Sequence, residues 1–395
     1  MMRLKMSRHG RWAVPATAVV LTGGVVAGLQ IPSAQAVPLL PAKTPAELLA
    51  MVNSQATVPA FTGTVVETTS LGLPQLPQVA NPTSITSLLT GSNTLKVYYE
   101  NSGHYRIAIP QTMSETDFIR DGSTLWQWSS TQNKVTKYAL PAPSAKAGKH
   151  AVAKLPPQVP QTPQQAANEV LAAVGKTTTV SVQSNVDVAG EAAYQLVLAP
   201  KDSSSLIGKV VIAVDGVHGV PLRLQVFAKG SSAPAFQIGF TQISYVSPAA
   251  ANLTFTPPPG STVSTENLAT GQKSAAAEGG ANQQAGTGFG MYGSGWLTVA
   301  ELPQSDLLPS FGAKGGASAS STAAAPAGSS LGSDTAGLES ALLGAAKPVS
   351  GTWGSGSLLH TSLVNVLIVN GELYIGAVQP SVLYSAVEHG VTSSG

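Results

Sequence analysis

Three short stretches carry residue types that could do chemistry, and each lacks the context that its chemistry requires. Residues 288–293 fit the dinucleotide pattern G-x-G-x-x-G, but no strand precedes them and no βαβ unit surrounds them. Residues 328–332 fit the G-x-S-x-G nucleophile elbow inside a Gly/Ala/Ser run, where such matches arise by composition. Residues 175–177 resemble the end of a P-loop, yet Val170 occupies the place of its first glycine. None of the three predicts a nucleotide site or a catalytic serine.

The titratable groups are sparse. The chain has no cysteine, which excludes thiolate zinc sites and a cysteine nucleophile, and its six histidines form no chelating pair or H-E-x-x-H motif. Glu115, Asp117 and Asp121 flank an apolar strand and could act as a carboxylate pair, although solvated charges at a strand end are the commoner case. We therefore predict no catalytic residue, no metal, no cofactor and no enzymatic activity.

The N-terminus has the three parts of a secretory signal peptide. Four basic residues among the first eleven precede an apolar run at 12–29, and Ala34-Gln-Ala36 supplies a small-x-small cleavage site. The alternative is an uncleaved membrane anchor, which Pro15 and the glycines in the run disfavour. Removing residues 1–36 changes the formal charge from +2 to −2. We expect an exported protein, extracellular or attached to the cell envelope, with no electrostatic basis for nucleic-acid binding.

The elements that would position a site are mostly strands. A helix with a capping box is predicted from Thr44, because Pro45 suits its first position and Glu47 follows three residues after the cap. A second capped helix is predicted at 162–175. Short alternating runs separated by turn residues predict an antiparallel, mainly β fold. These runs are 61–70, 94–100, 104–109, 116–122, 123–130, 134–140, 177–185, 192–200, 208–215, 220–228, 235–246 and 253–260.

The C-terminal third changes composition. Residues 266–333 are mostly linker-like, with a short ordered piece at 293–303, and 18 of the 22 residues at 312–333 are Gly, Ala or Ser. In the segment 334–395, Asn370-Gly371 joins two apolar runs and predicts a β-hairpin, and Pro380 opens a last helix. We expect this hairpin to dock on the preceding domain. The alternative is a separate small domain built with the last helix.

Two tryptophans stand out in the hairpin at Asp121–Tyr138. Trp126 and Trp128 are two residues apart on a strand, so both indoles project from one face. Large apolar side chains are most often plain core. The alternative is that the sheet curls into a half-barrel whose concave apolar face forms a pocket.

The order of motifs over residues 40–265 resembles the LolA/LolB/RseB lipoprotein-carrier superfamily. The stretch from Asp121 to Trp128 is similar to the family's "dG-x-x-lW-x-y" strand pair. Residues 212–224 are similar to its strand-turn-strand with a "D…G-x-P" turn, and 255–260 to its closing "F-x-f-P-x-G" segment. The Gly/Ala/Ser-rich run at 312–333, here called the tether, and the C-terminal segment at 334–395 lie outside the motifs of this family. The Ala/Gly-rich composition suggests a high-GC, actinobacterial source, in which delivery to an outer membrane would have no place.

The resemblance implies an incomplete antiparallel β-barrel covered by helices, spanning residues 37–265, with an apolar cavity for acyl chains and no catalytic residues. The side chains expected to line that cavity are Tyr99, Phe118, Trp126, Trp128, Leu196, Leu198, Phe236 and Phe240.

Three functions stay open at this point. The first is a carrier or sink for an acyl chain, a lipid or a lipoprotein. The second is a regulatory binding protein like RseB, with a membrane-protein partner in the cell envelope. The third is a secreted structural domain whose core is filled.

Overall fold

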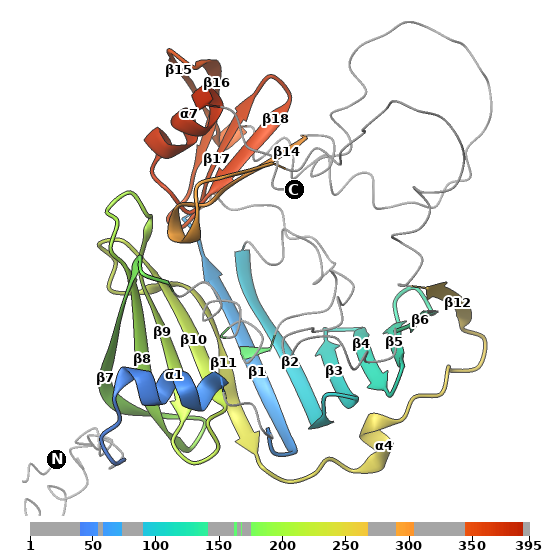
Figure 1. Ribbon diagram of the computed structural model, residues 1–395. Coiled ribbons are helices and arrows are strands. Elements are labelled where there is room, and N and C mark those ends of the chain that lie inside the picture. Colours follow the sequence, from blue (N-terminus) through green and yellow to red (C-terminus); the bar gives the residue numbers. More distant parts are fainter. Residues whose placement is uncertain are drawn as a thin grey trace, which may run out of the picture. The chain divides into compact units, whose positions relative to one another are not determined.

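A long sheet dominates the computed structural model (Figure 1), which describes residues 40–53, 58–72, 90–140, 162–163, 167, 175–267, 290–303 and 344–389. Twelve strands pair in the order β12-β6-β5-β4-β3-β2-β1-β11-β10-β9-β8-β7. The first seven in chain order are β1 (Phe61–Ser70), β2 (Thr90–Asn101), β3 (His104–Pro110), β4 (Glu115–Asp121), β5 (Thr124–Ser129), β6 (Lys134–Ala139) and β7 (Thr178–Val188). The others are β8 (Glu191–Pro200), β9 (Ile207–Asp215), β10 (Pro221–Ala228), β11 (Pro234–Ser244) and β12 (Thr262–Asn267).

Strand β1 lies in the middle of this sheet. It pairs with β2 on one side and with β11 on the other, both antiparallel, so it joins two meanders, β2–β6 and β7–β11. The end strands β12 and β7 do not pair with each other among the described residues, and the sheet stays open. The mainly β, antiparallel, incomplete barrel predicted above is confirmed.

Helix α1 (Pro45–Asn53) begins as its sequence predicts. The Thr44 amide donates to Glu47 Oε2 over 2.7 Å, and the Glu47 amide donates to Thr44 Oγ1 over 3.2 Å, which completes the capping box. Leu48 and Val52 on its inner face are 0% and 1% exposed and join the core of the sheet, where α1 contacts β7 and β8. Of the second predicted helix, the structure describes Thr162, Pro163, Ala167 and Gly175, and Pro163 and Ala167 are helical.

Six more strands form a second antiparallel sheet, in the order β13-β14-β18-β17-β16-β15. Asn370 and Gly371 both have positive φ, 53° and 85°, and make the predicted two-residue turn between the two central strands. The apolar face packs on helix α7, which opens at Pro380 as predicted. The elements are β13 (Gly290–Tyr292), η1 (Gly295–Leu297), β14 (Val299–Pro303), β15 (Lys347–Gly351), β16 (Gly354–His360), β17 (Asn365–Val369), β18 (Glu372–Gly376) and α7 (Pro380–His389).

The second sheet has a core of its own and also contacts the long sheet. Ser205 and Val378 form an antiparallel bridge, and Leu363 packs against Leu71 and Ala235. The indole Nε1 of Trp296 donates to Thr178 Oγ1 over 2.7 Å. Both sheets belong to one compact unit, residues 38–395.

Two stretches differ from the sequence prediction. Residues 253–260 do not form a strand: the short helix α4 (Ala250–Leu253) is followed by non-strand backbone, and β12 begins at Thr262. The three prolines at 257–259 have no N–H to donate to a ladder, so pairing starts after them. The sequence predicted that residues 266–333 are mostly linker, with a short ordered piece at 293–303. In the structure, residues 290–303 contain two strands of the second sheet: β13 pairs with β14, and β14 pairs with β18. The predicted signal peptide at 1–36 and the predicted tether at 312–333 lie outside the described residues.

Candidate functional site

One face of the long sheet carries a mostly apolar surface, here called the core face. Residues directly opposite each other in a ladder share a face. The partner pairs Phe118–Ile107, Ile107–Val97 and Val97–Gly63 carry this face from β4 to β1. The pairs Phe236–Val226, Val226–Val210 and Val210–Leu198 carry it from β11 to β8. The same pairing of facing residues shows which of the eight residues expected to line the cavity lie on one face.

Six of those eight lie on the core face. Phe118, Leu196 and Leu198 are 0% exposed and Phe240 is 5% exposed, all within one core cluster. Tyr99 and Phe236 are half-buried and pack against the same cluster. The strand register shows that these six side chains share one face. That they line a ligand cavity stays a prediction.

Trp126 and Trp128 do not share that face, and the expectation that they do is wrong. They share a face with each other, as predicted, but Phe118 stands opposite Gln127, while Trp126 stands opposite Ile119 and Trp128 opposite Asp117. The reason is the two-residue turn at Gly122-Ser123, which makes Asp121 and Thr124 partners and so places even-numbered residues of β4 opposite odd-numbered residues of β5. The turn length, visible in the sequence, could have given this result.

The indoles instead form part of a second, smaller apolar layer, here called the outer face. Phe255, which follows α4, lies 5.7 Å from Trp126 and 6.5 Å from Trp128 between ring centroids. Ile119, opposite Trp126, and Val135, opposite Trp128, are 0% exposed and lie outside the main core cluster. Lys137 Nζ stands 5.2 Å from the Trp126 ring centroid. The proline-rich segment after α4 therefore covers this part of the sheet.

An ion cluster lies on the same outer face. Arg106 on β3 bonds Glu115 over 3.0 Å and Asp117 over 2.5 Å, both on β4. Asp117 is 2% exposed, so the interpretation of these acids as solvated strand-end charges is wrong for Asp117. Burial, reinforced by a hydrogen bond with Glu115, raises the pKa of Asp117 to about 7 against the opposing attraction of Arg106.

The core face also holds an acid that the sequence analysis missed. Glu67 on β1 stands opposite Ile238 and Asn93, and its side chain is 8% exposed. Burial raises the pKa of Glu67, partly offset by a hydrogen bond with Asn93. The clue in the sequence was a single acid at an inward position of the alternating run at 61–70. Glu67 is thus a buried acid on a mostly apolar face, which also carries Asn93 opposite it and Gln127 opposite Phe118.

Aromatic rings gather where β1, β2 and β11 meet. Phe61 stacks on Tyr99 with ring centroids 5.2 Å apart, and its edge meets Phe240 at 5.6 Å. Gly63 leaves the space for Phe240, because a Cβ added there would lie 2.7 Å from that ring. Burial raises the pKa values of Tyr99 and of Tyr105, its partner on β3. This part of the core face is thus aromatic and only partly closed to solvent.

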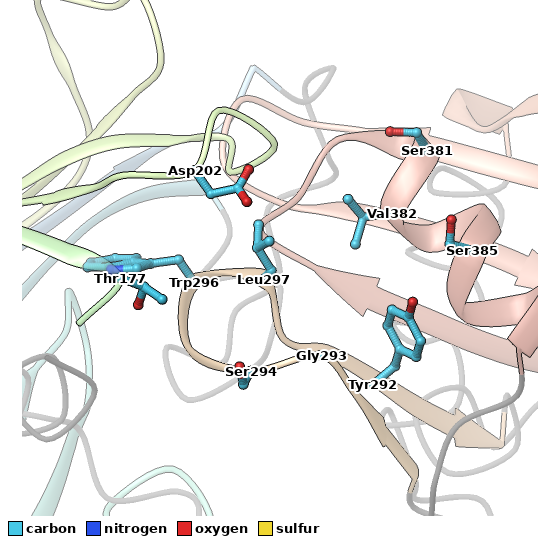
Figure 2. Close-up of a pocket in the computed structure, with 10 residues that line it drawn as sticks. All are labelled: Thr177, Asp202, Tyr292, Gly293, Ser294, Trp296, Leu297, Ser381, Val382 and Ser385. Atoms are coloured by element: carbon cyan, nitrogen blue, oxygen red, sulfur yellow. The ribbon is translucent and has the colours of Figure 1, made fainter. Parts of the chain in front are cut away.

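A separate pocket of about 580 Å³ lies where the second sheet meets the end of β7 and β8 (Figure 2). It is lined by Thr177 and Asp202 from the long sheet, by the loop from Tyr292 to Leu297, and by the first turns of α7. In Figure 2, Tyr292 points toward the helix that carries Ser385, and Trp296 points the other way, toward Thr177. We call this the junction pocket; nothing in the sequence pattern indicated it.

The described residues hold no group of three or more His, Asp or Glu side chains placed to bind a metal ion. None of the described helices combines the length and the apolar character that a membrane span requires.

Comparisons with known proteins give structural likenesses at low identity. No family model and no curated protein matches the chain. A structure of MucB, a protein also solved with MucA from Pseudomonas aeruginosa, has 14% identity and a TM-score of 0.37, with 89% of this chain and 97% of MucB covered. A LolA superfamily protein from Nitrosomonas europaea has 13% identity and a TM-score of 0.23, covering 54% of this chain and 99% of its own. An uncharacterized conserved protein from Thermus thermophilus has 11% identity and a TM-score of 0.32, covering 56% and 98%.

Proposed function

We propose that this protein is an exported, non-enzymatic binding protein of the cell envelope that holds an acyl chain of a lipid or lipoprotein on its core face. One observation carries the proposal: the mostly apolar core face extends across an open sheet and includes aromatic side chains that are only half-buried. Tyr99, Tyr105 and Phe236 are of this kind. The resemblance of the motifs at 121–128, 212–224 and 255–260 to lipoprotein carriers supports the same cargo.

The energetics of such a site are adequate. Each methylene that leaves water contributes about 0.8 kcal/mol, so a dozen buried methylenes supply about 10 kcal/mol before association costs. Glu67 adds one polar group to this face; burial raises its pKa, so protonation, and with it hydrogen-bond donation to an ester or acid headgroup, is easier than for a free glutamate. An acyl chain is the ligand that uses an apolar face with few polar contacts.

The proposal is tested on the purified full chain with a fluorescent fatty acid and by native mass spectrometry for bound lipid. Strand β2 offers a matched pair, because Tyr98 and Tyr99 are adjacent, both half-buried, and point to opposite faces. Tyr99→Ser is expected to weaken fatty-acid binding several-fold, and Tyr98→Ser to leave it unchanged. Equal effects of the two variants, or no saturable binding by the parent, would exclude the site.

A second function, regulation through a membrane-protein partner in the envelope as in RseB, is favoured by the second sheet. That sheet has its own core, including Val299, Leu367 and Leu383, and an acyl-chain site on the long sheet does not require it. Capture of one envelope membrane protein by the full chain, and loss of that capture after substitutions on the second sheet alone, would establish this role. Capture that persists after those substitutions would count against it.

A further inference from the structure

The junction pocket lies on different elements from the core face, and its lining has a distinct chemistry. Asp202 is its one charged side chain, and Thr177, Ser294, Ser381, Ser385 and Tyr292 bring five hydroxyl groups. Leu297 and Val382 supply apolar surface between them. No Lys, Arg or His is among the lining residues. The volume, about 580 Å³, lies within the range of small-molecule sites.

Its polar groups are available to a ligand. The hydroxyls of Tyr292, Ser381 and Ser385 have no hydrogen-bond partner among the residues that the structure describes. Asp202 Oδ1 accepts the Ser204 amide over 2.8 Å, which orients the carboxylate and leaves its second oxygen to other donors. The indole N–H of Trp296 is engaged with Thr178, so Trp296 anchors the loop and offers only its ring.

The loop that forms one wall is preorganised. Gly293 has φ of 73°, and a Cβ there would stand 2.5 Å from the Leu297 carbonyl oxygen, so the turn closes tightly on itself. The Leu297 amide and the Thr298 hydroxyl donate to carbonyls of the same loop, over 3.2 Å and 3.0 Å. A wall that is already ordered loses little conformational freedom when a ligand binds.

We propose that the junction pocket binds a neutral saccharide. Hydroxyl groups both donate and accept, so a set of side-chain hydroxyls matches a ligand whose surface is itself mostly hydroxyl. A carboxylate accepts strongly from sugar hydroxyls. The apolar side chains and the indole offer surface to the C–H face of a sugar ring.

Charged ligands fit this lining less well. A phosphate, sulfate or carboxylate would meet Asp202 with no basic residue among the lining side chains. An amine would gain little from Asp202, because that carboxylate is exposed and its ion pair would be screened by water. The five hydroxyl groups outnumber the single carboxylate, so they determine which class of ligand the pocket prefers.

The test uses the full chain and nuclear magnetic resonance saturation-transfer or calorimetric titration with glucose, N-acetylglucosamine, maltose and cellobiose. Glucosamine and glucose 6-phosphate serve as the amine and anion controls. We expect saturable, millimolar or tighter binding of at least one neutral sugar. No saturable binding of a neutral sugar, or binding of glucosamine alone or glucose 6-phosphate alone, would overturn the proposal.

Two variants locate the binding. Asp202→Asn is expected to weaken it a few-fold, because an amide oxygen is a weaker acceptor than a carboxylate. Ser385→Phe, on a half-buried position of α7, is expected to abolish it by filling the pocket. The matched control is Asp187→Asn, an exposed aspartate that likewise accepts a backbone amide, that of Gly190, at a turn of the long sheet. Binding that responds equally to Asp202→Asn and Asp187→Asn would also reject the pocket. A fatty-acid titration of the same variants keeps this result separate from the core-face proposal, since none of them lies there.

Discussion

Asp117 on β4 and Arg106 on β3 lie 2.5 Å apart on the outer face of the sheet, and one oxygen of the aspartate, Oδ1, is buried without a hydrogen-bond partner. Trp128 stands directly opposite Asp117 on the next strand. An incompletely satisfied carboxylate in that position favours its protonated form. The free energy of unfolding should therefore depend on pH in a way that a solvent-exposed ion pair would not produce.

We expect the free energy of unfolding to fall as the pH rises from about 4 to about 7. Burial raises the pKa of Asp117 from 3.8 to about 7, so in that interval the folded state holds a proton that the unfolded state has released. The contribution of Asp117 is complete below about pH 4 and is lost as the pH passes its folded pKa. Urea unfolding at several pH values measures it. Asp117→Asn should make the free energy of unfolding less dependent on pH in this interval. Asp187→Asn, at an exposed turn, should keep the pH dependence of the parent protein. Identical curves for the parent and both variants would refute the assignment of the pH dependence to Asp117.

The outer-face position of the indoles predicts their fluorescence. In a Trp296→Phe, Trp353→Phe background of residues 37–395, the emission comes from Trp126 and Trp128. Phe255→Ala should shift it to longer wavelength, because both rings lose their aromatic cover. Saturating fatty acid should leave the emission of the parent background unchanged, since the core face lies on the other side. A strong fatty-acid response would place the acyl chain on the outer face instead.

Gly63→Ala should destabilise the protein by about 1–3 kcal/mol, the usual range for overpacking. The added methyl would lie 2.7 Å from the Phe240 ring and 2.9 Å from the Gln242 carbonyl oxygen, and backbone cannot move aside as a side chain can. Gly175→Ala is the control, because its added methyl meets nothing within 4 Å. The denaturant midpoints of the two variants report the difference. A neutral Gly63→Ala would mean that Phe240 is free to move.

The contact between the two sheets can be trapped by a disulfide. The chain has no cysteine, and Ser205 and Val378 are partners in an antiparallel bridge, where Cα atoms approach within disulfide range. The Ser205→Cys, Val378→Cys variant should lose both thiols on mild oxidation and melt at a higher temperature than its reduced form. The single variants, which keep their thiol, are the controls. Persistent free thiols in the double variant would show that the sheets separate.

Features that depend on neighbouring residues could be predicted from the sequence. Relations between strands could be predicted only in part. The capping box at Thr44 and Glu47 and the turn at Asn370-Gly371 depend on neighbours in the chain, and both are confirmed. The spacing of Trp126 and Trp128 gave their common face but not which face, because that depends on register with β4. The junction pocket joins residues more than a hundred positions apart, so no local pattern marks it.

The central position of β1 sets an order of events during synthesis. Strands β1–β6 can pair as soon as they leave the ribosome, since each is next to its predecessor in the sheet. The other edge of β1 must wait for β11, about 160 residues later, or about 10–30 s at ordinary elongation rates. Throughout that interval a ten-residue strand presents open backbone donors and acceptors, a template for pairing with other chains. The nascent chain therefore exposes, throughout this interval, one edge of a strand that later lies in the middle of the finished sheet.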